Sequence, residues 1–407
     1  MNSQHVSATT PSRHISELFG ASSKSLAASI NERLMAPVSE PDLCVRLTGR
    51  ALPADKWLLS SATQKLIRRG LAEQAVKTAL ALHAVDPEYL PRRLPIIAFE
   101  DIGLGNVLAC FDTLHVFRTQ RFASATPEHV RRQSLMNLVY RLARSVKSRT
   151  GCDIFCLAHA NQNFPTAAAR FARSSEQCLI AMAADRGAAT TSRALALHLL
   201  SGMSVREGRW PRTLSRFNAS ALKAVAKKLH LPPVIAWMLI EGRNTAGLAA
   251  MLPLAMEAVA DTDLHTELMD AGDAKAFAEK VVVGVPACAA DQYTRVGKGA
   301  IAEFTKAIRD KHPRFFENAP DGRSHSKLVS MAIFHFEGSK LDQWLETKAT
   351  AEYRQRIECI ELQALGLPDP ESHVELYRIL EVESELLWRI RQSHLRAAYG
   401  RGRRGGE

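Results

Sequence analysis

Two polar segments of the chain could support catalysis, and the first is Arg92-Arg93 with Glu100-Asp101. Adjacent carboxylates beside guanidinium groups can hold a metal ion or act as general acid and base. The same residue types also form structural ion pairs that join two helices, and such pairs at a surface contribute little stability. The structural interpretation is favoured. In the alternative, Glu100 and Asp101 are candidate catalytic acids.

The second segment is 291–298, with the sequence DQYTRVGK. It follows the apolar stretch 281–290 and precedes a helical pattern that starts near Ala300. The free N–H groups and the dipole of a helix N-terminus favour anions. We therefore predict a phosphate site here, with Asp291 as a candidate catalytic acid and with Tyr293, Thr294, Arg295 and Lys298 as binding residues. A simple polar cap and loop explains the segment equally well, and both interpretations stay open.

Other sequence patterns for chemistry are weak or missing. Cys152, Cys156 and His159 share one helical face and could bind zinc. Cysteine is, however, a common small core residue, so we predict no metal site. The P-loop pattern is absent, because the nearest piece, 296–300, lacks the first glycine and the Ser/Thr that binds Mg²⁺. The esterase, zinc-protease and paired CxxC motifs are absent too, and the sequence predicts no cofactor and no nucleotide hydrolysis.

Apolar residues recur at helical spacing along most of the chain. A helix over 71–82 ends at Asp86-Pro87, and Thr126-Pro127-Glu128 has the residues that start another. Further helices are predicted at 152–160, 174–184, 190–200, 220–230, 233–240, 246–260, 339–365 and 371–398. Only 281–283 suggests a strand, which is too short to imply a sheet. We predict an all-α protein of two or three packed helical subdomains without a substantial sheet.

Composition suggests where the subdomains begin and end. The polar, Ser/Thr-rich residues 1–30 are predicted to be a flexible arm, and 31–207 the first helical domain. Gly and Pro near 207–211 and again in 312–323 interrupt the periodicity. We therefore predict a second helical domain at 212–311, long C-terminal helices at 324–398 and a disordered basic tail at 399–407.

The charge of the chain favours a polyanionic partner. Lys plus Arg number 53 and Asp plus Glu 42, a net charge of +11. The tail residues Arg401, Arg403 and Arg404 could follow a phosphate backbone without reading bases. The 7 scattered cysteines indicate a reducing, cytoplasmic compartment. No apolar run reaches the roughly 18–20 residues that span a bilayer, so no membrane partner is predicted.

Residues 64–160 resemble the C-terminal helical region of the RarA/MgsA family, replication-associated ATPases of the clamp-loader type. The segments that carry the resemblance are 79–82 (ALAL), 86–94 (DPEYLPRRL), 97–104 (IAFEDIGL) and 142–148 (LARSVKS). The family's ATPase module is absent. The resemblance implies an all-helical domain that self-associates and works near DNA, with replication proteins as possible partners. Arg92, Arg93, Lys147 and Arg149 are the candidate nucleic-acid contacts in this region.

Two functional hypotheses follow from these features. In the first, the chain is a non-enzymatic, DNA-associated helical protein of replication, repair or mobile-element DNA metabolism. In the second, it is a DNA- or nucleotide-modifying enzyme of the base-modification type known from phages and mobile elements. The lack of catalytic motifs favours the first. A deep pocket that joins residues 291–298 to Glu100 or Asp101 would favour the second.

Overall fold

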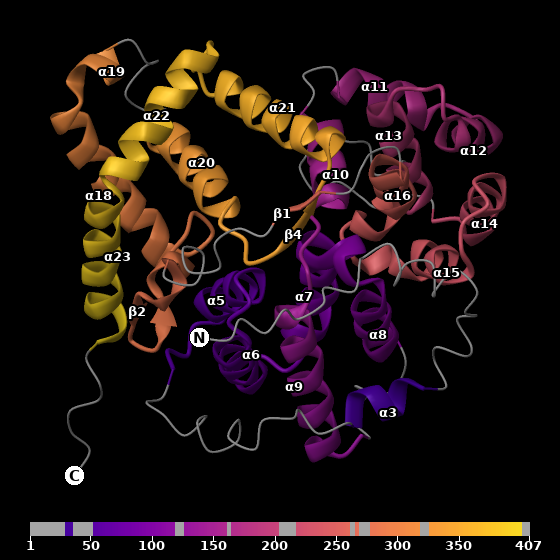
Figure 1. Cartoon of the computed structure of the whole chain (residues 1–407), viewed down its shortest axis with the longest axis horizontal. Coiled ribbons are helices and arrows are strands. Elements are labelled where there is room, and N and C mark those ends of the chain that lie inside the picture. The colour runs from indigo at the N-terminus through magenta and orange to yellow at the C-terminus, as the bar shows by residue number, and fades with distance from the viewer. Residues whose placement is uncertain are drawn as a thin grey trace, which may run out of the picture.

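The computed structural model describes residues 29–35, 52–118, 126–160, 164–202, 217–260, 265–267, 277–317 and 325–400. Most of these residues are helical, and their strands are at most three residues long. The predicted all-α fold is therefore confirmed. In Figure 1 the helices form three groups that follow one another in the sequence.

The first group is drawn in indigo and purple in Figure 1. It contains α3 (Ile30–Met35), α5 (Lys56–Arg68), α6 (Ala72–Val85), α7 (Tyr89–Ile97), η1 (Ala98–Ile102), η2 (Gly103–Asn106), α8 (Val107–Arg118) and α9 (Glu128–Arg144). Helix α5 packs along α6, and α6 along α9. The Asp55 side chain accepts hydrogen bonds from the N–H groups of Trp57 and Leu58, at 2.9 and 3.1 Å, and so fixes the start of α5.

The second group lies on the opposite side of Figure 1 from the last group. It contains α10 (Thr150–Ala160), α11 (Phe164–Ala172), α12 (Glu176–Ala184), α13 (Thr190–Leu200), α14 (Ala219–Lys228), α15 (Pro233–Glu241), η5 (Gly242–Asn244), η6 (Leu248–Met251) and α16 (Leu252–Ala260). The helices predicted at 152–160, 174–184, 190–200, 220–230 and 233–240 are found, with ends that differ by at most two residues. The helix predicted at 246–260 is divided into the 3₁₀ turn η6 and α16.

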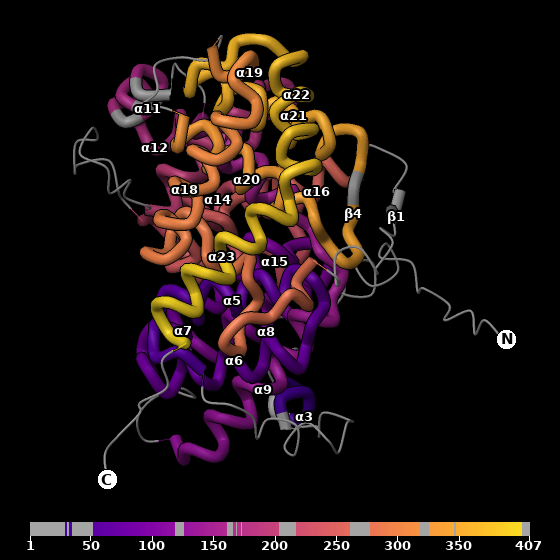
Figure 2. Tube along the Cα trace, turned by 90° about the vertical axis from the view of Figure 1, so that its left-hand side faces the viewer, coloured from indigo at the N-terminus to yellow at the C-terminus, as the bar shows by residue number. Residues whose placement is uncertain are grey.

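The third group is drawn in orange and yellow. It contains η7 (Ala287–Ala289), α18 (Arg295–Lys311), α19 (Pro313–Glu317), α20 (His325–Gly338), α21 (Lys348–Ala364), α22 (Pro370–Val382) and α23 (Ser384–Tyr399). Helix α18 packs along α23, whereas α21 packs back against α10 of the second group. Figure 2, turned by 90°, shows α23 running obliquely across the face toward the first group.

The strands of the described residues form two small antiparallel pairs. β2 (Val281–Val282) pairs with β3 (Val285–Pro286), and β1 (His265–Glu267) pairs with β4 (Trp344–Glu346). The predicted strand near 281 therefore exists, and it is as short as its sequence suggested.

The predicted long helices 339–365 and 371–398 are wrong in extent. Between α20 and α21 the chain is extended, because the backbone around Trp344 hydrogen-bonds to Lys147 instead of to its own helix: Lys147 N donates to Gln343 O at 2.7 Å and Leu345 N donates to Lys147 O at 2.8 Å. Thr347 then starts α21 with a capping box. The second predicted helix is interrupted at Glu383, between α22 and α23. The helix expected to start within Thr126-Pro127-Glu128 begins at Glu128.

The apolar cores cross both predicted domain boundaries. The larger core contains Leu58 and Leu195 as well as Leu222 and Leu254, from both sides of 207–212. The smaller core contains Phe304 and Leu328, from both sides of 312–323. Residues 1–28 of the predicted arm and residues 401–407 of the predicted tail lie outside the described residues.

One helical stretch, Tyr89–Arg118, is long and apolar enough to cross a membrane by length and composition alone. The sequence did not suggest it, because Glu100 and Asp101 interrupt the apolar residues. Of its most apolar window, 72 % is buried inside the protein, as in the core helix of a soluble fold. The stretch is also divided by η1 and η2 into separate helices.

Candidate functional site

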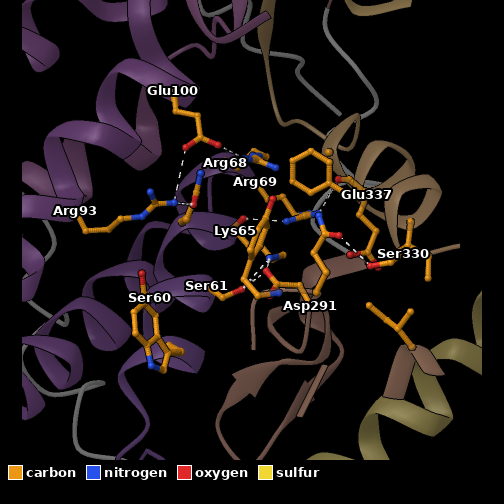
Figure 3. Close-up of a pocket in the computed structure, with 18 of the residues that line it drawn as sticks. Ser60, Ser61, Lys65, Arg68, Arg69, Arg93, Glu100, Asp291, Ser330 and Glu337 are labelled. Carbon is orange, nitrogen blue, oxygen red and sulfur yellow. Dashed lines mark hydrogen bonds and ion pairs between the residues drawn. The ribbon is translucent and has the colours of Figure 1, made fainter. Parts of the chain in front are cut away.

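A cavity of about 360 Å³ lies between the first and third groups of helices. Its walls come from α5, α7 and η1 on one side and from α20 and the loop 291–293 on the other. Figure 3 shows the charged side chains of both sides converging on it. The cavity thus joins the two polar segments singled out in the sequence, which are about two hundred residues apart.

One face of α5 forms a polar wall of the cavity. Its lining residues are Trp57, Ser60, Ser61, Gln64, Lys65 and Arg68, which recur every three or four positions and so share one side of the helix. The opposite face supplies apolar residues such as Leu59 and Leu66 to the core. Core packing on one side therefore fixes the direction in which the polar side chains point.

The π-helical turn η1 separates two acids that are neighbours in sequence. A π-turn is rare and occurs often at functional sites. Glu100 is partly buried and lines the cavity, where its carboxylate lies 3.5 Å from Arg68 and 3.7 Å from Arg93. Asp101 is fully buried and does not line it. The turn ends at Gly103, whose φ of 45° and close approach to the Ser148 carbonyl leave no room for a Cβ atom.

Asp101 holds the wall of the site together and is not placed to act on a substrate. Its carboxylate accepts hydrogen bonds from Arg68 Nε at 2.8 Å and from Gln64 Nε2 at 2.9 Å, and Arg149 lies 3.5 Å away. Burial opposes the charge, but the two guanidinium groups and these hydrogen bonds hold the pKa of Asp101 below its ordinary value. The predicted catalytic role of Asp101 is therefore replaced by a structural one.

Asp291 lines the cavity from the other side. It forms an ion pair with Lys65, and Ser61 Oγ donates to its carboxylate at 2.7 Å. Burial opposes ionisation here too, but Lys65 and Ser61 keep the pKa of Asp291 below its usual value. Asp291 is thus a carboxylate that orients Lys65.

Arg69 carries a buried positive charge that lacks a paired carboxylate. It lines the cavity and is fully buried. Two of its nitrogens donate to the carbonyls of Lys65 and Glu337, at 3.2 and 3.0 Å, while Nε has no hydrogen-bond partner. The nearby Glu337 carboxylate is paired with Arg391 instead. Burial accordingly lowers the pKa of Arg69, as expected of an under-compensated cation.

Aromatic side chains stand at the edge of the cavity. Trp57 is 54 % exposed and Tyr293 66 % exposed, and both line it. Trp57 contacts Tyr89 edge-on with 5.6 Å between ring centroids. Large exposed rings beside a charged cavity offer surfaces on which a planar ligand can stack.

The other predicted binding residues lie outside this cavity. Arg92, Arg295 and Lys298 are exposed, and none of them lines it. Thr294 is buried and caps α18: its hydroxyl accepts from Gly297 N at 3.0 Å and donates to Asp291 O at 3.0 Å. Its predicted role in phosphate binding is replaced by helix capping.

Lys147 and Arg149 do not lie on an exposed surface that could bind nucleic acid. Lys147 is fully buried, and its ammonium donates to the carbonyls of Ala143, at 2.9 Å, and of Ser145. It is therefore a structural lysine, and its predicted nucleic-acid contact is ruled out by its burial. Arg149 pairs with Asp101 and lines a neighbouring cavity. Arg401, Arg403 and Arg404 lie outside the described residues.

Sequence reasoning missed the polar face of α5 and the buried Arg69. The signal in the sequence was the spacing of Ser61, Gln64, Lys65 and Arg68, which fall on one side of a helix. Nothing in the sequence distinguished Arg69 from Arg68, because only the packing shows which of the two is paired.

The described residues contain no group of three or more His, Cys, Asp or Glu side chains arranged to hold a metal ion. Comparison with family models, with curated proteins and with solved structures finds no match to this chain. The resemblance to the RarA/MgsA family thus gains no support from these comparisons.

Proposed function

We propose that this protein binds a nucleotide, free or as a unit of DNA, in the cavity and modifies it there. The observation that carries the proposal is the meeting of Arg93 and Glu100 with the loop 291–293 in one cavity. Of the two hypotheses drawn from the sequence, this arrangement supports the enzyme.

The chemistry of the cavity suits a nucleotide. The under-compensated guanidinium of Arg69 favours a negatively charged group, which phosphate provides. The exposed rings of Trp57 and Tyr293 suit a base, because stacking on aromatic side chains tolerates every base. A volume of about 360 Å³ falls in the range of small-ligand pockets.

Glu100 is the residue best placed for acid–base chemistry. It is partly buried at the cavity wall, where its carboxylate lies within 4 Å of the guanidinium groups of Arg68 and Arg93. Asp291, by contrast, is committed to Lys65 and Ser61. We therefore assign Glu100 as the candidate general base, and Arg69 and Arg93 as the candidate side chains that hold the anionic group.

A DNA-associated role in replication, repair or mobile-element DNA metabolism is also part of the proposal. The net charge of +11 supports association with DNA through counterion release. Replication proteins and further copies of this chain are the partners that the family resemblance implies. We place the protein in the cytoplasm, in keeping with the six described cysteines, all of which are free thiols.

Calorimetric titration with deoxynucleoside monophosphates and short single-stranded oligonucleotides tests the proposal. Arg93→Ala removes a cation from the cavity and is expected to weaken binding about tenfold, since a hydrogen bond to a charged group contributes about 1.5–3 kcal/mol. Arg92→Ala is the matched control, because Arg92 is exposed on the same helix and outside the cavity. If both variants lost the same nucleotide affinity, or if the parent protein bound no nucleotide, the cavity would not be the nucleotide-binding site.

A further inference from the structure

A second cavity, of about 300 Å³, adjoins the first. The two cavities share five lining residues: Arg93, Glu100, Tyr293, Phe334 and Gly338. Tyr293 and Phe334 form an edge-on pair with 6.2 Å between ring centroids. Ligands bound in the two cavities would therefore both lie beside Glu100.

The cavities differ in the charge that their own residues contribute. Apart from the shared residues, the first is lined by three cations, Lys65, Arg68 and Arg69, and by two carboxylates. The second is lined by three carboxylates, Asp153, Glu358 and Glu361, and by two guanidinium groups. One of these two, that of Arg149, lies 3.5 Å from the fully buried Asp101, which also pairs with Arg68. The second cavity therefore favours a cation.

Glu358 is a partly buried carboxylate of this cavity and lies on α21. Its neighbours are His335 on α20, Arg354 and Glu361 on α21, and His373 and Tyr377 on α22. His335 is itself hydrogen-bonded to Glu361, at 2.7 Å. Burial raises the pKa of Glu358, and His335 and Arg354 offset only part of that rise. An incoming positive charge would stabilise the ionised form of Glu358.

The remaining lining of the second cavity is largely apolar. Ile96, Phe155, Leu248, Leu341 and Ile357 line it together with the acids. Such a lining suits a short hydrocarbon chain, which gains free energy by leaving water. The arrangement combines a place for an alkyl chain with carboxylates for a cationic end.

We propose that the second cavity binds a small alkylamine, with its ammonium group at Glu358 and Glu361. The binding itself does not require a nucleotide. That the amine is a second substrate, placed beside the nucleotide at Glu100, rests on the proposed function.

Calorimetric titration of the full-length protein with 1-aminopentane and with 1-pentanol tests the inference. The amine should bind and the alcohol should not, and the net charge of +11 would disfavour unspecific attraction of a cation. Glu358→Gln should weaken amine binding at least tenfold. Glu352→Gln, at an exposed position of the same helix, should change it less than twofold.

A second variant and the pH dependence of binding test the inference independently. Glu361→Gln should also weaken binding of the amine, and amine binding to the parent protein should fall as the pH drops through the raised pKa of Glu358. Failure of the amine to bind, equal binding of the alcohol, or equal effects of Glu358→Gln and Glu352→Gln would overturn the inference. Nucleotide titration of the same samples separates the two proposals. A parent protein that binds the amine but no nucleotide would refute only the function proposed for the first cavity.

Discussion

At the scale of single residues, Glu100 and Asp101 are adjacent in the chain but lie in opposite environments. Glu100 lines the cavity, whereas Asp101 is fully buried among Gln64, Arg68 and Arg149. The sequence identified both acids but could not tell them apart, because nothing in it indicates the π-turn that the chain forms here.

This difference predicts different effects of removing each charge. Asp101→Asn leaves two guanidinium groups without their buried partner and should lower the free energy of unfolding by about 3–5 kcal/mol. Glu100→Gln should lower it much less and should instead impair turnover or ligand binding. Chemical denaturation and ligand titration of both variants check this, and equal stability losses would contradict it.

The contribution of Asp101 should also depend on pH. Its pKa is lower in the folded protein than the value of about 3.9 in an unfolded chain. The stabilisation is therefore complete above that value and is lost as the pH falls through the lower, folded pKa. The difference in stability between the parent protein and Asp101→Asn should accordingly shrink below about pH 4. A difference that stays constant from pH 7 to pH 3 would be inconsistent with the ion pair.

At the scale of elements, helix α18 presents the loop 291–293 to the cavity. The Thr294 hydroxyl ties the first turn of the helix to the Asp291 carbonyl. Gly297 allows the close approach, since a Cβ atom there would meet the Asp291 backbone. The sequence predicted a polar helix start at this place. It could not show that the Thr294 hydroxyl binds the backbone of the loop 291–293 and is not available to a phosphate.

Changes at the start of α18 should therefore separate capping from binding. Thr294→Ala should cost about 1 kcal/mol of stability and also weaken nucleotide binding by displacing Asp291. Changing both Arg295 and Lys298 to Ala should alter stability by less than about 0.5 kcal/mol and leave nucleotide binding in the cavity unchanged. Denaturation curves and titrations measure both effects. A large loss of nucleotide binding in the double variant would restore the phosphate site originally predicted at this helix.

The sequence predicts the bounds of a helix well where apolar spacing alone determines them. It predicts them less well where the segment forms backbone hydrogen bonds to residues far away in the chain. The helix at 190–200 was found with the same ends, because apolar spacing determines it. The segment 339–347 was predicted as helix, but it pairs with the backbone of Lys147, a contact between residues far apart in the chain. Sequence periodicity cannot report such pairing.

At the scale of the whole molecule, the net charge of +11 predicts salt-dependent binding to DNA. Deletion of residues 400–407 removes Arg401, Arg403 and Arg404. Each phosphate contact contributes roughly −0.9 to the slope of log K against log salt, so the slope should become shallower by up to about 2–3 units. Titrations of duplex DNA at several salt concentrations check this. Identical affinity and slope in both proteins would show that the tail takes no part.

Photocrosslinking of a single-stranded oligonucleotide that carries 5-iododeoxyuridine, followed by mass spectrometry, tests the central claim most directly. If the cavity holds a nucleotide unit, the crosslinked peptides should contain Trp57, Tyr89 or Tyr293, which line it. Arg93→Ala should reduce these crosslinks, and Arg92→Ala should not. Crosslinks confined to surfaces away from the cavity, equally strong in both variants, would contradict the account.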